Sequence, residues 1–139
     1  MLDQEFTADT LRLLRAAVIA HAMAVGMPES RAADVMLAVH ELAANVVRHG
    51  SGTGQLRMRI AAGALHCRVT DPGLARFDGD HPAAPSKRVR APAVFQLDPW
   101  PYRRGHGLGL VRELADQVTV MTGPNGSQVT ASFTLPGAP

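Results

Sequence analysis

The chain has 139 residues, which is enough for one domain with its own hydrophobic core. Its 14 basic and 12 acidic residues give a net charge of only +2, which does not favour nucleic acid as a partner. The single cysteine, Cys67, excludes a disulfide framework, and the six histidines are not spaced as zinc ligands. The sequence shows no signal peptide and no long apolar run, so we expect a cytoplasmic protein with no membrane segment.

The first part of the chain predicts one strand and two helices. Residues 2–7 are typical of a short edge strand, and residues 9–26 carry apolar side chains at helical spacing. A second, longer helix follows the turn at Pro28 and runs to about His49. The glycine-rich residues 50–54 end that helix, because so many glycines favour a turn.

Four further strands are predicted from alternating apolar and polar residues. Residues 55–61 and 65–70 form an antiparallel hairpin, and residues 117–122 and 128–135 follow later. Because each strand has a single apolar face, the helices must cover one face of the sheet. The sequence therefore predicts an α+β fold in one domain, residues 1–139. Its sheet is mixed but mostly antiparallel, with about five strands and about three helices in a two-layer α/β sandwich.

The second helix carries the first residues that indicate chemistry. Glu41 and Asn45 are four positions apart, so their side chains stand one turn apart on one face. A carboxylate and a carboxamide in this arrangement could accept a proton and offer oxygen to a hard cation such as Mg²⁺. Taken alone, the pair is more simply explained as the solvated face of an amphipathic helix.

Two later segments also have a simple and a functional interpretation. Asp71 comes directly after a strand, and Gly73 stands two positions later. This pattern indicates either a plain turn or a carboxylate aimed into a cleft. Gly105, Gly107 and Gly109 open a helix, where backbone N–H groups can approach an anion. The glycines match neither the Rossmann fingerprint nor the P-loop, because no strand leads into them and no Gly-Lys-Ser/Thr follows.

A long segment, residues 74–104, separates these two motifs. It is rich in proline and arginine and has no sustained periodicity. A connection of this length inside a compact domain is typical of a lid, a binding loop or disorder.

Taken in order, these signals resemble the motifs of the GHKL ATPase superfamily, which includes gyrase, the heat-shock chaperone and histidine kinases. Residues 41–50 resemble its N box, 69–73 its G1 box, 105–116 its G2 box, and 126–129 its Gly-Thr-x-Val segment. The small size is most similar to the anti-sigma factor serine/threonine kinases. The resemblance implies a sandwich of the GHKL (Bergerat) type with an ATP lid at about residues 74–104.

The resemblance also implies a role for each matching residue. Glu41 would be the catalytic base, and Asn45 would be the Mg²⁺ ligand. Asp71 would accept the adenine amino group, supported by the hydroxyl of Ser127. The nucleotide-binding set that it implies is Asn45, Arg48, His49, Asp71, Gly73, Gly105, His106, Gly107, Leu108, Gly109 and Ser127.

The implied function is phosphorylation of an anti-anti-sigma protein with ATP and Mg²⁺, together with sequestration of a sigma factor by a homodimer. Arg12 and Arg15 lie on the first helix and are either solvated or contact a partner. Ala75 departs from the family, because it replaces the second glycine of the G1 box. That departure favours the alternative, a non-catalytic nucleotide-sensing module that switches a partner interaction.

Overall fold

Alternating apolar residues produce all five expected strands in the computed structural model, which describes residues 1–72, 108–124 and 126–137. The strands are β1 (Leu2–Phe6), β2 (Gly54–Ala61), β3 (Ala64–Asp71), β4 (Gln117–Gly123) and β5 (Gly126–Thr134). They form one sheet in the order β1-β2-β3-β5-β4. Every neighbouring pair is antiparallel, so the described sheet is antiparallel throughout rather than mixed.

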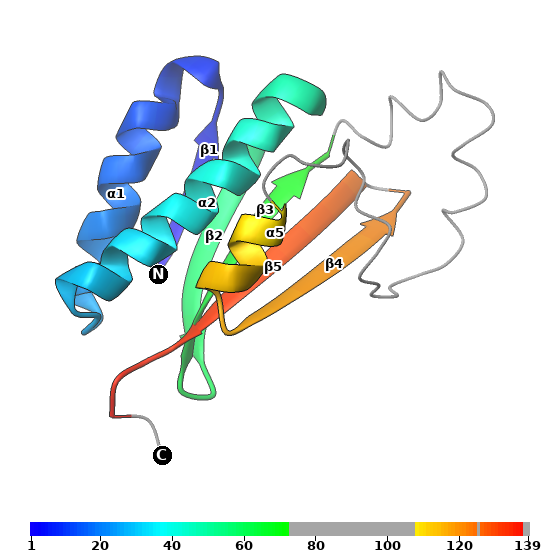
Figure 1. Ribbon diagram of the computed structural model, residues 1–139. Coiled ribbons are helices and arrows are strands. Elements are labelled where there is room, and N and C mark those ends of the chain that lie inside the picture. Colours follow the sequence, from blue (N-terminus) through cyan, green and yellow to red (C-terminus); the bar gives the residue numbers. More distant parts are fainter. Residues whose placement is uncertain (73–107, 125, 138–139) are drawn as a thin grey trace.

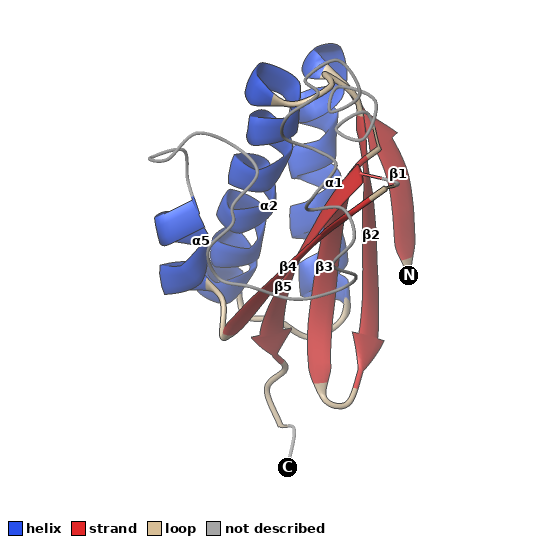
Figure 2. Ribbon diagram, turned by 90° about the vertical axis from the view of Figure 1, so that its right-hand side faces the viewer, coloured by secondary structure: helices blue, strands red, loops and turns tan. Residues whose placement is uncertain are grey.

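The helices all lie on one face of this sheet, as Figure 2 shows. They are α1 (Leu11–Ala24), which follows the short 3-10 turn η1 (Ala8–Thr10), α2 (Glu29–His49) and α5 (Leu108–Leu114). The side chain of Thr7 caps η1 by accepting a hydrogen bond from the backbone N–H of Asp9. In Figure 1, α2 lies between α1 and α5. The predicted two-layer α+β sandwich is confirmed. Among the described residues, no helix is both long and apolar enough to cross a membrane.

The core fills the space between the helices and the sheet. From α2 it receives Val35, Val39, Leu42 and Val46, and from the sheet it receives Leu56, Met58, Leu65, Cys67, Val129, Ala131 and Phe133, none more than 3% exposed. Burial raises the pKa of the Cys67 thiol to about 12, which keeps the sulfur protonated and inert.

One residue on the apolar face of β2 is not buried in this core. Ile60 continues the apolar face of β2, but its side chain is 48% exposed. The reason is that the β2–β3 hairpin extends beyond the layer of helices (Figure 1). Two positive φ values at its tip, 51° at Ala62 and 76° at Gly63, give the tight turn that the sequence predicted.

Arg31 fixes α5 against α2. Its guanidinium donates a 2.7 Å hydrogen bond from Nη1 to the carbonyl oxygen of Leu114, the last residue of α5. Nη2 lies 3.0 Å from Oδ2 of Asp116, which also accepts a 2.7 Å hydrogen bond from the Thr134 amide. The guanidinium carbon stands 5.1 Å from the centre of the Phe133 ring. One side chain therefore joins α2, the end of α5 and β5.

We predict that Leu42→Ala will lower the free energy of unfolding by about 2–5 kcal/mol, because it leaves a cavity where α2 meets the sheet. Leu13→Ala on α1 is the matched control. That side chain is 64% exposed, so the change should cost less than about 0.5 kcal/mol. Urea denaturation followed by circular dichroism measures both values. Equal losses would contradict the packing described above.

Candidate functional site

Buried polar side chains gather at one end of the structure. Of the four in the described residues, Asn45, Asp71 and Ser127 lie there, with exposures of 2%, 1% and 2%, whereas Ser132, 9% exposed, faces His66 on the opposite side of the sheet. The first three are residues that the sequence motifs singled out. Burying a polar group costs free energy unless it has hydrogen-bond partners, so a cluster of this kind indicates a specific role.

Asp71 is held by a residue that the motifs did not indicate. The hydroxyl of Ser51 donates a 2.6 Å hydrogen bond to Oδ1 of Asp71, and the Ser51 amide donates a 3.3 Å bond to Oδ2. Ser51 follows Gly50, the residue that caps the C-terminal end of α2, so this contact ties that helix end to the last residue of β3. Both carboxylate oxygens are engaged by Ser51, which fixes the orientation of the Asp71 side chain. The only signal in the sequence is a serine in a glycine-rich turn, and this is too common to identify a partner.

Asp71 and Ser127 stand directly opposite each other in the β3–β5 ladder. The two residues are 56 positions apart in the chain, and the antiparallel register alone brings them together. Gly126 precedes Ser127 with a φ of +113°, and a Cβ there would press against the Asp71 carbonyl and lie 2.8 Å from the Pro72 Cα. Glycine at position 126 therefore lets the start of β5 pass close to the end of β3.

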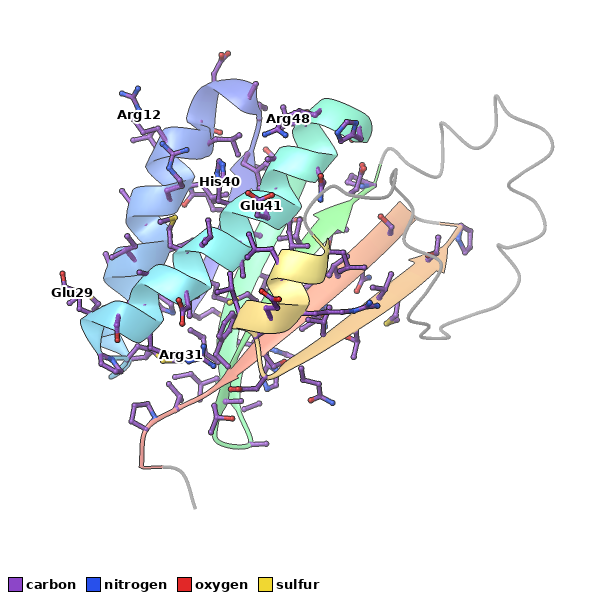
Figure 3. All side chains as sticks on the ribbon, viewed as in Figure 1. Arg12, Glu29, Arg31, His40, Glu41 and Arg48 are labelled. Carbon is purple, nitrogen blue, oxygen red and sulfur yellow. The ribbon has the colours of Figure 1, made fainter. Side chains whose placement is uncertain are left out.

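Asn45 and Glu41 differ in burial although they lie on one side of α2. Asn45 is buried with the core residues of the helix, so it is not part of the solvated face on which the sequence pattern placed it. Glu41 is half-buried, and Figure 3 shows it on the outer surface of α2. The simpler expectation of two solvated side chains is thus wrong for Asn45.

His40 precedes Glu41 and lies on the side of α2 next to α1 (Figure 3). Burial lowers the pKa of its imidazole, and the charges of Arg15 and Arg48 lower that pKa further, while Glu41 opposes them. The Nδ1 atom is buried and has no hydrogen-bond partner within the described part of the chain. His40 is therefore mostly neutral at neutral pH. It places no positive charge beside Glu41, the next residue in the chain.

The remaining predicted residues are placed as follows. Arg48 is exposed near the end of α2. His49, which is the last residue of α2, is half-buried. Leu108 and Gly109 form the first turn of α5, the helix beside α2. Gly73, Gly105, His106 and Gly107, and the proposed lid at residues 74–104, lie outside the described residues.

The candidate site residues come from separate parts of the sequence. Asn45 and Glu41 lie on α2, Asp71 lies at the end of β3 and Ser127 lies at the start of β5. The structure brings Asp71 and Ser127 together and joins them to the end of α2 through Ser51. This end of the sheet therefore offers a carboxylate, a hydroxyl and a carboxamide. Such groups can form hydrogen bonds to a polar ligand and can bind a hard cation.

One known protein family matches nearly the whole chain. The model of the histidine kinase-like ATPase domain matches residues 5–133. The chain belongs to this family. The match begins near the end of β1 and ends within β5, and it includes every predicted site residue.

The fold of this histidine kinase-like ATPase domain is also found among solved structures. It is similar to the crystal structure of the RsbU and RsbW domains of Rv1364c from Mycobacterium tuberculosis, with a TM-score of 0.64 and 19% sequence identity over 97% of the present chain. The chain spans 32% of the length of that protein chain, and at this identity the similarity concerns the fold. No curated protein shows significant similarity to the sequence.

We predict that Gly126→Ala will lower the free energy of unfolding by more than Gly52→Ala does. Both glycines have positive φ, so each change introduces backbone strain of about 1–2 kcal/mol. A Cβ at position 52 meets nothing within 4 Å, whereas one at position 126 meets the backbone of Asp71 and Pro72. Urea unfolding of the two variants measures the difference. Identical losses would show that the β3–β5 approach does not require glycine.

Proposed function

We propose that this histidine kinase-like ATPase domain is an ATP-dependent serine/threonine protein kinase of the anti-sigma factor type. The observation that carries the proposal is that Asp71 pairs with Ser127 across two strands and is hydrogen-bonded to Ser51 just beyond the end of α2. Asp71 and Ser127 belong to motifs that resemble those of the anti-sigma kinases, and both are buried although they are far apart in the chain.

Asp71 would select adenine. A carboxylate accepts a hydrogen bond from the adenine amino group, whereas guanine presents a carbonyl at the same position. Ser51 holds the carboxylate in one orientation, which supports selective recognition because little entropy is then lost on binding. Ser127, opposite Asp71, would support the same contact through its hydroxyl.

Asn45 would bind Mg²⁺ through its carboxamide oxygen, which fits a hard cation. Nucleotide-bound Mg²⁺ neutralises phosphate charge, and phosphoryl transfer depends mainly on such neutralisation and on positioning. The proposed phosphate contacts come from two places. One set is Leu108 and Gly109 in the first turn of α5, together with Gly105, His106 and Gly107 before them. The other set is Arg48 and His49 at the end of α2.

Glu41 would accept the proton of the attacking hydroxyl. It lies one helical turn before Asn45, so base and metal ligand stand on neighbouring turns of α2. Its half-buried position keeps the carboxylate reachable for a hydroxyl from a protein substrate.

The substrate would be an anti-anti-sigma protein, and the partner silenced by this domain would be a sigma factor. The named RsbW domain of the similar structure shares the fold, which supports this class of partner. Exposed Arg12 and half-buried Arg15 on α1 are the proposed partner contacts, in a homodimer that forms through β1 and α1.

A second candidate function rests on Ala75 in the G1 box. If the chain binds ATP without transferring phosphate, it acts as a nucleotide-sensing module that switches a partner interaction. Incubation with ATP labelled on the γ-phosphate and the purified anti-anti-sigma partner separates the two functions. Label on the partner supports the kinase, and ATP binding without label supports the sensing module.

We predict that Glu41→Ala will slow phosphate transfer by about 10²–10⁴-fold, since this is the usual contribution of a general base. ATP affinity should change little, because the proposed nucleotide contacts remain. Glu29→Ala, at the exposed start of the same helix, is the control and should transfer phosphate normally. Transfer by Glu41→Ala at the wild-type rate would remove Glu41 from the mechanism.

We further predict that Asp71→Asn will weaken ATP binding by about tenfold or more, because the amide presents a donor where the adenine amino group needs an acceptor. Calorimetric titration with ATP measures this. Asp9→Asn in the exposed η1 turn should bind like the wild type. If a folded Asp71→Asn protein binds ATP with unchanged affinity, the adenine contact lies elsewhere.

A further inference from the structure

The face of the sheet opposite the helices carries a second feature, distinct from the proposed nucleotide site. No described element covers this face, as Figure 2 shows. A shallow groove of about 550 Å³ runs across it. It is lined by Arg57, Arg59, Ala61 and His66, by Arg68, Gln117, Thr119 and Met121, and by Gln128, Thr130 and Ser132. We call this surface the basic groove.

Positive charge is concentrated in the middle of the basic groove. Arg57 on β2 stands directly opposite Arg68 on β3, and Arg59 stands opposite His66. The like charges of Arg57 and Arg68, directly opposite each other in an antiparallel pair, destabilise the sheet. An arrangement that costs stability in the isolated domain indicates that another molecule supplies negative charge to this face.

Only part of this charge is neutralised within the described residues. Arg57 pairs with Asp3 of β1 at 3.2 Å, a contact on the rim of the sheet. No salt bridge joins Arg59 or Arg68 to a carboxylate in the part of the chain that the structure describes. Asp3 and Glu5 are exposed on β1, so negative charge borders the groove at one edge while the centre stays positive.

The floor of the basic groove is fixed by His66. Its Nδ1 lies 2.8 Å from the hydroxyl of Ser132, and its Nε2 lies 3.0 Å from the carbonyl oxygen of Ala61. Both ring nitrogens are therefore engaged, and the imidazole forms a preorganised surface between the arginines. Thr119, Thr130 and Gln128 add hydroxyl and amide donors around it.

We propose that the basic groove binds an acidic segment of a partner protein, whose carboxylates pair with Arg59 and Arg68. Arginine is suited to this role because its planar guanidinium can bind a carboxylate through two parallel hydrogen bonds. A cationic group on the same segment would meet Asp3 and Glu5 at the rim, which orients the partner. Nucleic acid fits less well, because the described residues that line the groove include no Phe, Tyr or Trp to stack on bases.

This surface does not depend on the proposed kinase activity. The nucleotide site is built from side chains under the helices and at the strand ends, whereas the groove residues lie on the opposite face. A partner in the groove therefore leaves the nucleotide site accessible, and both can be occupied at once.

The test is a titration of the isotope-labelled full chain with a short Glu-rich peptide, followed by NMR. We expect shifts at groove residues of β2, β3 and β5, and no comparable shifts with a peptide that carries Gln in place of Glu. The double variant Arg59→Gln/Arg68→Gln should bind the Glu-rich peptide about tenfold more weakly, as expected for the loss of two exposed ion pairs. It should be at least as stable as the wild type, because like-charge repulsion is removed.

The matched control is Ser30→Glu/Ala33→Glu, which changes the net charge by the same amount at exposed positions near the start of α2. It should bind the Glu-rich peptide like the wild type. Equal weakening in both double variants, or shifts confined to the helical face, would overturn the proposal. So would equally tight binding of single-stranded oligothymidylate in the groove, which would indicate nucleic acid instead.

Discussion

The whole arrangement depends on one constraint, that each strand has a single apolar face. Leu65, Cys67 and Val69 of β3 point to one side of the sheet, and polar residues alternate with them. The helices can bury apolar surface only on that side, so they form one layer. Asp71 and Ser127 are buried where β3 ends and β5 begins, and the opposite face is left mainly to charged and polar residues.

Two hydrogen-bonded contacts hold α2 in place between neighbouring elements. Near its start, Arg31 binds the end of α5, and just beyond its C-cap Gly50, Ser51 binds Asp71 of β3. Both contacts involve charged groups, which form stronger hydrogen bonds than neutral pairs do. The proposed base and metal ligand, Glu41 and Asn45, thus lie on a helix that is fixed at both ends against the elements carrying the other motifs.

The fold was largely predictable from the sequence, because alternation and helical spacing are local properties. The pairing of Asp71 with Ser127 could be expected only as part of an ordered set of motifs, since antiparallel register is a long-range property. Ser51 and Arg31 could not be found, because their partners lie far away in the chain. The burial of Asn45 could not be predicted either, since an asparagine one helical turn from Glu41 and Arg48 fits a solvated face equally well.

The ladder between β3 and β5 has a consequence for how such a domain can change over time. The position of Asp71 relative to Ser127 is set by backbone hydrogen bonds between two adjacent strands, and not by the segment that connects them. The entropic cost of closing a loop rises only slowly with its length. Insertions and deletions between these strands can therefore accumulate while the two side chains keep their spacing, so this connection is where relatives can diverge in length and regulation without rebuilding the Asp71–Ser127 pair.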